Sequence, residues 1–346
     1  MSHRRYGLSL FALFLLLLGT MVYSLFVGAV RLSGAELWAL LVSWVHSGQN
    51  LSAPVDPTTI TILFSIRLPR ILLALSVGAA LSVSGTAFQG FFKNILADPY
   101  VIGASSGAAL GAAIAMVLNL PPLGPVSSAS LFAFVGALGA TVLAFAISRA
   151  SGDPPPAAAL LLAGTALSAL FSSLLSLVLV ARDKDLHRVY YWLLGGLGGT
   201  TWVELVYTIP LMVGGCTLVF LAARPLDLLV QGDDVAQALG LNVKRARLVV
   251  ALGASMAAAA AVASAGIIGF VGLVAPHMVR LLIGPSHGRL LPAAALGGAV
   301  LVLLADLIAR TAAAPMELPI GIVTSLIGAP FFIYLLVKRG RNLGGQ

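Results

Sequence analysis

The chain contains very few charged residues. Asp, Glu, Lys and Arg make up only 9% of its 346 residues, against roughly 25% in an ordinary soluble domain. Hydrophobic residues account for 59%. This composition excludes a water-soluble globule and indicates an integral membrane protein.

Groups that carry chemistry are also scarce. Cys216 is the single cysteine and lies in an apolar segment, so it cannot form an internal disulfide and is interpreted as a buried, inert thiol. No G-x-x-x-x-G-K-[ST] phosphate loop occurs, so we do not expect the chain to hydrolyse ATP, and any ATP must be handled by a partner. The five histidines lack metal-binding spacing, so the sequence predicts no enzyme, no metal site and no cofactor.

The net charge of +8 does not indicate a nucleic-acid partner. The basic cluster of Lys244, Arg245 and Arg247 has no aromatic residues interleaved with it, and no longer basic run exists. In a membrane protein, an excess of Lys and Arg more often marks the cytoplasmic loops. We therefore attribute the positive charge to membrane topology.

Long apolar segments recur along the whole chain. A helix needs about 20 residues to cross about 30 Å of hydrocarbon, and segments of this kind predict a single all-α domain over residues 1–346. The first segment could pass for a signal peptide, but it is too long for one and nine others follow, so we expect an uncleaved helix. The ten predicted spans are 7–30, 59–92, 101–118, 127–148, 156–181, 202–222, 248–264, 267–283, 290–309 and 318–337.

The distribution of basic residues orients these spans. With the N-terminus inside and ten crossings, 13 of the 20 Lys and Arg residues fall on the inner side, which predicts that both termini are cytoplasmic. The 13 residues are Arg4, Arg5, Lys93, Arg149, Arg224, Lys244, Arg245, Arg247, Arg280, Arg289, Lys338, Arg339 and Arg341. The boundary between the seventh and eighth spans is weakly marked, because only Ser264, Gly266 and Gly269 interrupt the apolar run.

Glycines predict where helices approach closely. Gly103, Gly107 and Gly111 recur every four residues, and Gly266, Gly269 and Gly272 crowd the start of the eighth span. Small residues allow neighbouring backbones to touch in lipid, so we interpret these glycines as packing devices.

A polar segment, QGDDVAQALGLNV, separates the sixth and seventh spans on the predicted cytoplasmic side. Its apolar and polar residues alternate at roughly helical spacing, and Gly232 and Gly240 bracket a short helix. Such a helix can present one face to another protein. The alternative is a helix lying on the bilayer surface, which the carboxylates of Asp233 and Asp234 disfavour because anionic lipids repel them.

Three arginines lie near predicted outer ends of spans. Arg67 and Arg70 precede most of the second span, and Arg310 ends the ninth. An arginine at a helix centre costs about 2.5–3.5 kcal/mol, so we expect these side chains at the outer interface, where ordinary snorkelling could also explain them. Asp306 lies one turn from Arg310 and is expected to pair with it. A proton-coupled secondary transporter would need a carboxylate deeper in the bundle, and the first five spans contain none.

Several long motifs resemble the permease subunit of the FecCD family, the bacterial ABC importers for iron-siderophores, haem and vitamin B12. They include RLPRILLALSVGAALSVSGTAFQGFFKNILADPYVIGASSGAALGA (67–112), YYWLLGGLGG (190–199), GFVGLVAPHMVRLLIGPSHGRLLP (269–292), LLADLIAR (303–310) and ELPIGIVTSLIGAPFFIYLL (317–336). The resemblance covers nearly the whole chain after the first helix. It implies a homodimer of ten-helix subunits in the inner membrane, two ATP-binding subunits and a periplasmic binding protein.

The resemblance also implies roles for particular residues. Segment 226–243 would supply the cytoplasmic coupling helices, and the residues assigned to ATPase contact are Gly232, Asp233, Asp234, Ala236, Leu239 and Gly240. Arg67, Arg70 and Arg310 would pair with glutamates of the binding protein. The pathway wall is expected from spans five and ten, with Ser168, Ser172 and Ser173 as polar positions.

The expected function is therefore a permease for a metal chelate. An iron-siderophore is the first expectation, followed by haem or cobalamin, because a mostly apolar wall suits a large chelate that must leave as easily as it enters. An ion-coupled secondary transporter and a membrane scaffold without transport activity are the alternatives.

Overall fold

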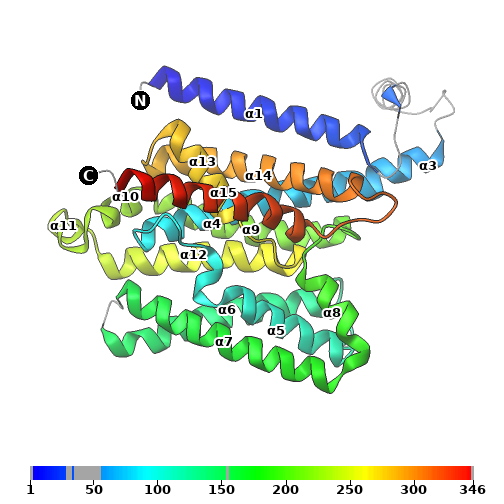
Figure 1. Cartoon of the computed structure of the whole chain (residues 1–346), viewed down its shortest axis with the longest axis horizontal. Helices are drawn as coiled ribbons and strands as arrows, with labels where there is room; N and C mark the ends of the chain where they lie inside the picture. Colours follow the sequence, from blue (N-terminus) through cyan, green and yellow to red (C-terminus); the bar gives the residue numbers. More distant parts are fainter. Residues whose placement is uncertain (1–2, 29–32, 35–55, 153–155, 344–346) are drawn as a thin grey trace.

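The computed structural model describes residues 3–28, 33–34, 56–152 and 156–343. In these residues every assigned element is helical, apart from an isolated bridge between Leu123 and Val126. The long helices run side by side as a bundle (Figure 1). The prediction of an all-α membrane protein is confirmed.

Each of the ten predicted spans corresponds to a helix. Seven helices in the described residues are long and apolar enough to cross a membrane, and α5, α13 and the apolar part of α15 (Ile320–Leu335) are shorter. The second span is a continuous helical rod made of α3, the π-helix η1 and α4. The bounds are α1 His3–Phe26, α3 Pro57–Ile60, η1 Thr61–Arg67, α4 Leu68–Phe91, α5 Ala104–Val117, α6 Ser128–Ser148, α7 Ala157–Ala181, α9 Trp202–Leu221, α12 Val243–Ala265, α13 Val271–Ile283, α14 His287–Thr311 and α15 Ile320–Leu343.

Short helices mark the two ends of the bundle. α10 (Ala223–Gln231) and α11 (Asp233–Ala238) lie at the end where α1 begins and α15 finishes, which we call the α11 end. α3 and α8 (Leu186–Leu193) lie at the opposite end, the α3 end (Figure 1). α8 was not predicted, and α10 begins three residues before the predicted coupling segment.

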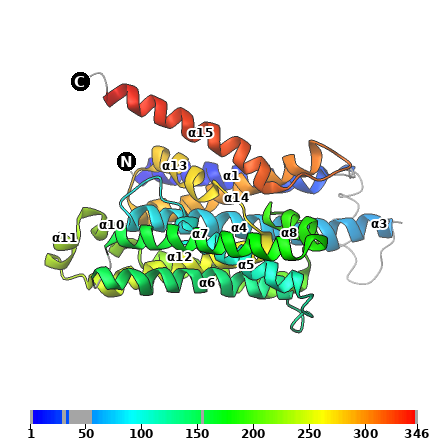
Figure 2. The same cartoon turned by 60° about the horizontal axis from the view of Figure 1, so that its bottom comes forward.

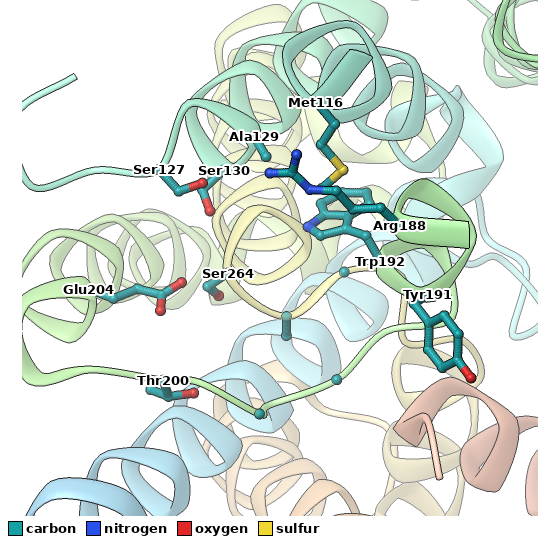
Figure 3. Close-up of a pocket in the computed structure, with 14 residues that line it drawn as sticks. Met116, Ser127, Ala129, Ser130, Arg188, Tyr191, Trp192, Thr200, Glu204 and Ser264 are labelled. Atoms are coloured by element: carbon teal, nitrogen blue, oxygen red, sulfur yellow. The ribbon is translucent and has the colours of Figure 1, made fainter. Parts of the chain in front are cut away.

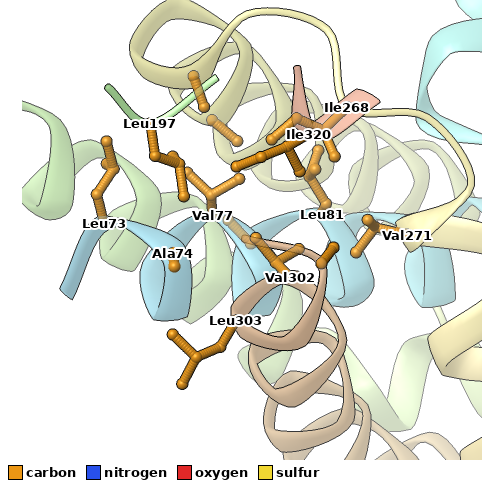
Figure 4. Close-up of a cluster of buried hydrophobic side chains, with 14 of the residues drawn as sticks. Leu73, Ala74, Val77, Leu81, Leu197, Ile268, Val271, Val302, Leu303 and Ile320 are labelled. Carbon is orange, nitrogen blue, oxygen red and sulfur yellow. The ribbon is translucent and has the colours of Figure 1, made fainter. Parts of the chain in front are cut away.

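α4 is the central helix of the bundle. It packs against α9, α12, α13 and α14, and its residues are buried along most of its length. Figure 4 shows Leu73, Val77 and Leu81 of α4 meeting side chains from α14, from the segment before α13 and from the start of α15. α1, by contrast, packs mainly on α14 and exposes most of its surface.

Glycines bring α4 into direct contact with its neighbours. A Cβ on Gly78 would lie 2.2 Å from the carbonyl oxygen of Gly298 on α14, and one on Gly85 would lie 1.9 Å from that of Gly272 on α13. Neither contact admits a larger residue without moving the backbone. The glycines of α5 behave in the same way, since a Cβ on Gly107 would lie 2.3 Å from the oxygen of Gly136 on α6. The predicted packing role is confirmed for Gly107, Gly111, Gly266 and Gly272. It is wrong for Gly269, where the nearest neighbour of a Cβ would be Ser325 Oγ at 3.9 Å, and Gly103 makes only ordinary contacts, from 3.5 Å.

The boundary between the seventh and eighth spans is a true break. α12 ends at Ala265, residues 266–270 are not helical, and α13 starts at Val271. Gly266 has a φ of 68° and Phe270 a φ of 66°, both in the left-handed region. The break lies against the glycine turn that follows α8, where the Gly196 N–H donates to the Ala265 carbonyl at 2.8 Å.

A short 3-10 helix, η2 (Pro99–Ile102), connects α4 to α5. The Asp98 side chain caps it by accepting the Tyr100 N–H at 2.8 Å. Burial raises the pKa of Asp98 to about 6, against the lowering effect of that hydrogen bond. The Tyr100 hydroxyl donates to the Ile268 carbonyl, so this corner is tied to the break before α13.

Two helices lie at the edges of the bundle. α7 packs on α5, α6 and η2, and its buried residues are Leu160, Ala163, Gly164 and Leu167. α15 diverges from the other helices towards its C-terminal end (Figure 2). Both helices therefore leave apolar surface uncovered within this single chain.

Candidate functional site

The α11 segment is a short helix held between two glycines. Gly232, with a φ of 127°, separates α10 from α11, and Gly240, with a φ of 81°, follows it. Asn242 then caps α12, because its side chain accepts the Arg245 N–H at 3.0 Å. The helix predicted between Gly232 and Gly240 is confirmed, although its contact with another protein is not tested by a single chain.

Ala236 was predicted to contact the ATPase, but it does not lie on the outer face of α11. It is 0% exposed and packs in a small core with Leu229, Val243 and Ala246. A residue without a long side chain is required there, because α11 rests directly on α10 and α12. The surface open to a partner instead carries Asp234, Val235 and Leu239, and Leu239 is 64% exposed.

Asp233 ties α11 to the rest of the bundle. One carboxylate oxygen accepts a hydrogen bond from Arg247 of α12 at 2.7 Å. The other lies 3.7 Å from the Lys93 ammonium, just after α4. The acidic start of α11 is therefore paired within the chain at Asp233 and exposed at Asp234.

A second charged cluster lies between α4 and α14 near the α3 end. Asp306 is fully buried, with Arg70 Nε 2.8 Å from Oδ1 and Arg310 Nε 3.2 Å from Oδ2. Arg70 Nη1 also donates to both carboxylate oxygens of Glu317 at 2.9 Å. The predicted pairing of Asp306 with Arg310 is confirmed, and Arg70 joins the same carboxylate.

The three arginines, which were expected at the outer interface, do not form a surface that is open to solvent. Arg67, Arg70 and Arg310 are all buried in this chain. Arg67 donates to the Leu25 carbonyl of α1, and Arg310 donates to the Ser24 hydroxyl and, at 3.1 Å, to the Ser24 carbonyl. These contacts hold the C-terminal end of α1 on the bundle. The exposed member of the cluster is Glu317, whose side chain is 44% exposed.

The position of Asp306 also bears on proton coupling. A carboxylate that carries protons must exchange them with water, whereas Asp306 is enclosed by two guanidinium groups. Arg70 comes from α4 and Arg310 from α14 itself, so the carboxylate joins the two helices. Asp306 is thus a structural counter-ion.

The three candidate serines lie on α7 but do not form one polar site. Ser168 is half-buried and lies close to Gly103, whereas Ser172 and Ser173 are exposed. The Ser173 hydroxyl donates to the Ala169 carbonyl of its own helix. The exposed surface around them is apolar and includes Leu162, Leu170, Leu177 and Val180.

A cavity of about 370 Å³ opens at the α3 end (Figure 3). Arg188, Tyr191 and Trp192 of α8 line one side, and Glu204 and Ser264 line the other. The Thr201 hydroxyl accepts the Glu204 N–H and the Thr201 backbone hydrogen-bonds the Glu204 side chain. Glu204 thus forms a reciprocal cap with Thr201 at the start of α9, which gives this carboxylate a structural role. No group of three or more His, Cys, Asp or Glu that could hold a metal occurs within the described residues.

The family assignment rests on the length of the match. The model of the FecCD transport family matches residues 15–338, which is nearly the whole chain. The chain belongs to the FecCD transport family. It is a transport permease with the helical architecture described above, and the ion-coupled alternative is not supported.

Relatives with known roles agree with this assignment. The hemin transport system permease HmuU of Yersinia pestis is 46% identical over 81% of this chain and 84% of its own length. The cobalamin import permease BtuC of Halobacterium salinarum is 42% identical over 89% and 81%. The Fe(3+) dicitrate permease FecD of Escherichia coli is 39% identical over 94% and 96%.

A solved structure shows the same fold. It is an inward-facing conformation of a proposed metal-chelate type ABC transporter, with a TM-score of 0.83 and 34% sequence identity. The match covers 95% of this chain and 98% of that one. The helix arrangement is therefore that of an importer subunit.

We expect Asp306→Asn to destabilise the chain strongly. It would leave Arg70 and Arg310 buried without their shared counter-ion, and breaking a buried ion pair typically costs about 3–5 kcal/mol. Thermal unfolding in detergent measures the effect. Glu317→Gln is the matched control, because its partly exposed pair with Arg70 should contribute only about 0–1 kcal/mol. Equal effects of the two substitutions would contradict the central role of Asp306.

Proposed function

We propose that the chain is the membrane subunit of an ABC importer and forms the pathway for a metal chelate such as an iron-siderophore, haem or cobalamin. The observation that carries this proposal is the near full-length match to permeases whose named cargoes are hemin, cobalamin and Fe(3+) dicitrate. These cargoes share one property, since each is a metal held in an organic ligand shell.

The chemistry of the described residues supports a chelate and not a naked ion. Stripping water from a metal ion requires oxygen, nitrogen or sulfur ligands in a cluster, and the described residues offer no cluster of this kind. The exposed face of α7 is apolar with a few serines, which would hold a bulky chelate only weakly.

Vesicles containing the permease, its ATPase subunits and its binding protein should therefore accumulate a chelate in an ATP-dependent way. Uptake of radiolabelled haem, cobalamin and ferric-siderophore is compared with uptake of free Fe³⁺ and Zn²⁺. Vesicles without ATP are the control. Faster ATP-dependent uptake of a free ion than of any chelate would overturn the proposed cargo class.

The uncovered helix faces support a dimer. α7 carries a row of exposed apolar side chains at one edge of the bundle, and a second copy of the chain can cover such a face. We propose that two copies meet there and enclose the pathway, with Ser168, Ser172 and Ser173 close to it. In this arrangement the α11 end is cytoplasmic, because it carries the basic residues Arg224, Lys244, Arg245 and Arg247.

The α11 segment is the proposed contact with the ATPase. Its exposed face combines Asp234, Val235 and Leu239, while Gly232 and Gly240 allow the sharp turns that make α11 protrude. A short helix held by the Ala236 core and the Asp233 pairs moves as a unit when pushed.

Replacing Leu239 by Asp should separate ATP hydrolysis from transport or release the ATPase. An apolar side chain that a partner buries contributes about 1.5–3 kcal/mol, and a carboxylate would also have to be desolvated. Uptake, ATP hydrolysis and complex assembly are measured together. Leu123→Asp is the control, since Leu123 is 58% exposed in a loop at the opposite end. Unchanged uptake and assembly in the Leu239 variant would rule out this contact.

Ala236→Arg tests a different property. Because Ala236 is buried against α10 and α12, an arginine there would displace α11 itself and would not merely roughen the contact surface. Loss of coupling in this variant would therefore show that α11 is needed for coupling, but not that Ala236 itself contacts the ATPase.

Docking of a binding protein is proposed at the α3 end, around Arg67, Arg70 and Arg310. In the single chain these guanidinium groups already have partners, so an incoming carboxylate would have to compete with Asp306 and Glu317. Glu317 is the accessible competitor, because its side chain is the exposed member of the cluster.

Glu317→Gln should then tighten docking. Removing this charge frees Arg70 Nη1 for a carboxylate of the partner, with a gain of up to about fivefold, equivalent to about 1 kcal/mol. Titration of the binding protein onto reconstituted transporter at low salt measures the affinity. Asp56→Asn is the control, since Asp56 is an exposed carboxylate before α3 at the same end. Unchanged or weaker docking would mean that the arginines serve only the internal cluster.

A further inference from the structure

A carboxylate on α10 fastens the α11 end of the chain to α14. Asp227 Oδ1 accepts the backbone N–H of His287 at 2.8 Å and lies 2.6 Å from Nδ1 of the same histidine. Its Oδ2 accepts the Ser286 hydroxyl at 3.2 Å. Ser286 is the residue before α14 and makes no capping bond with its own side chain. Asp227 therefore caps α14 from a different helix, where the helix dipole also favours a negative charge.

The His287 ring is wedged between three helices. It is buried, and a Cβ on Gly90 at the end of α4 would lie 2.6 Å from its Nε2. The same position would be 3.2 Å from Leu226 of α10, which is also buried. α4, α10 and α14 therefore meet at this ring, and none of them can shift there without moving the others.

α14 extends this contact across the bundle. It has 25 residues, which at 1.5 Å per residue corresponds to about 37 Å. Midway it touches α4 through Gly78 and Gly298, and near its far end Asp306 binds Arg70. A displacement of α10 would therefore act on α14, which is held by Asp227 near its first residue and by the Asp306–Arg70 pair near its last turns.

We propose that the Asp227–His287 contact is the link that transmits movement of α10 and α11 to α14 and α4 during transport. Both residues act as positioning residues, since neither is placed on the cargo or on ATP. The proposal rests on the coupling role of α11 given above. Only Gly232 separates α10 from α11, so a push on α11 reaches Asp227 within two turns of helix.

The assembled complex in vesicles provides the test, with uptake and ATP hydrolysis measured on the same sample. Asp227→Ala should keep ATP hydrolysis within about twofold of wild type and lower uptake about tenfold, because a hydrogen bond to a charged group is lost at the link. The ATP consumed per cargo molecule therefore rises. Asp227→Asn keeps an oxygen that can accept the His287 N–H, and it should recover most of the uptake.

Gln231→Ala is the matched control, because Gln231 is an exposed polar residue at the end of the same helix. It should behave as wild type. A merely structural role would reduce the amount of assembled complex but not change the ATP consumed per cargo molecule. If assembled Asp227→Ala complexes consume as much ATP per cargo molecule as wild type, the proposal is overturned.

A double-mutant cycle decides the case if Asp227→Ala does not assemble. Asp227→Ser, which lacks the carboxylate that binds His287, is combined with His287→Gln, and a shared link predicts that the double variant is no worse than the worse single variant. Additive losses overturn the link. Leu239→Asp separates this result from failure of the coupling assignment. If Leu239→Asp uncouples transport and the Asp227 variants do not, only the link is wrong; if Leu239→Asp has no effect, the coupling role of α11 is wrong.

Discussion

Direct backbone contact around α4 is the constraint on which the rest of the structure depends. Lipid provides no hydrophobic force that would drive one helix onto another, so association must come from close packing and polar contacts. Gly78 and Gly85 supply the packing by letting α13 and α14 touch the α4 backbone. These helices enclose the apolar core in Figure 4. Near the two ends of α14, Asp306 meets Arg70 of α4 and His287 meets Asp227 of α10.

Much of this architecture could be predicted from the sequence, because a membrane span is a local property. Apolar length alone locates the ten helices, and the four-residue spacing of Gly103, Gly107 and Gly111 indicates a closely packed face, although not which helix covers it. α8 escaped prediction because eight residues with polar and aromatic side chains do not form an apolar run. The start of α10 was not located for a related reason. Its alternating polar and apolar side chains continue into α11 across Gly232, so the pattern does not mark where α10 begins.

The site was less predictable, because spacing along a helix says which residues share a face but not what covers that face. Ala236 was placed towards a partner, yet α10 and α12 cover it. The arginines were expected to pair with carboxylates of a partner, yet Arg70 already pairs with Asp306, which is 236 residues away in sequence. Asp227 and His287 carry no motif that joins them across 60 residues. The packing of α14 brings Asp306 to Arg70 and His287 to Asp227, and the packing of α11 on α10 and α12 covers Ala236.

The break between α12 and α13 depends on hydrogen bonds from distant parts of the chain. Its unwound backbone can remain in a bundle only if protein groups satisfy it, because hydrocarbon supplies no donors or acceptors. The Tyr100 hydroxyl donates to the Ile268 carbonyl, and the Gly196 N–H donates to the Ala265 carbonyl. The carbonyls of Gly195 and Leu194, in the same turn as Gly196, accept the N–H groups of Ile320 and Gly321. The donors at the break precede it in the chain, whereas the turn that presents Gly196 is itself bonded by the start of α15. A chain truncated before α15 would thus keep the other helices described here but lose the two hydrogen bonds that Ile320 and Gly321 give to the turn.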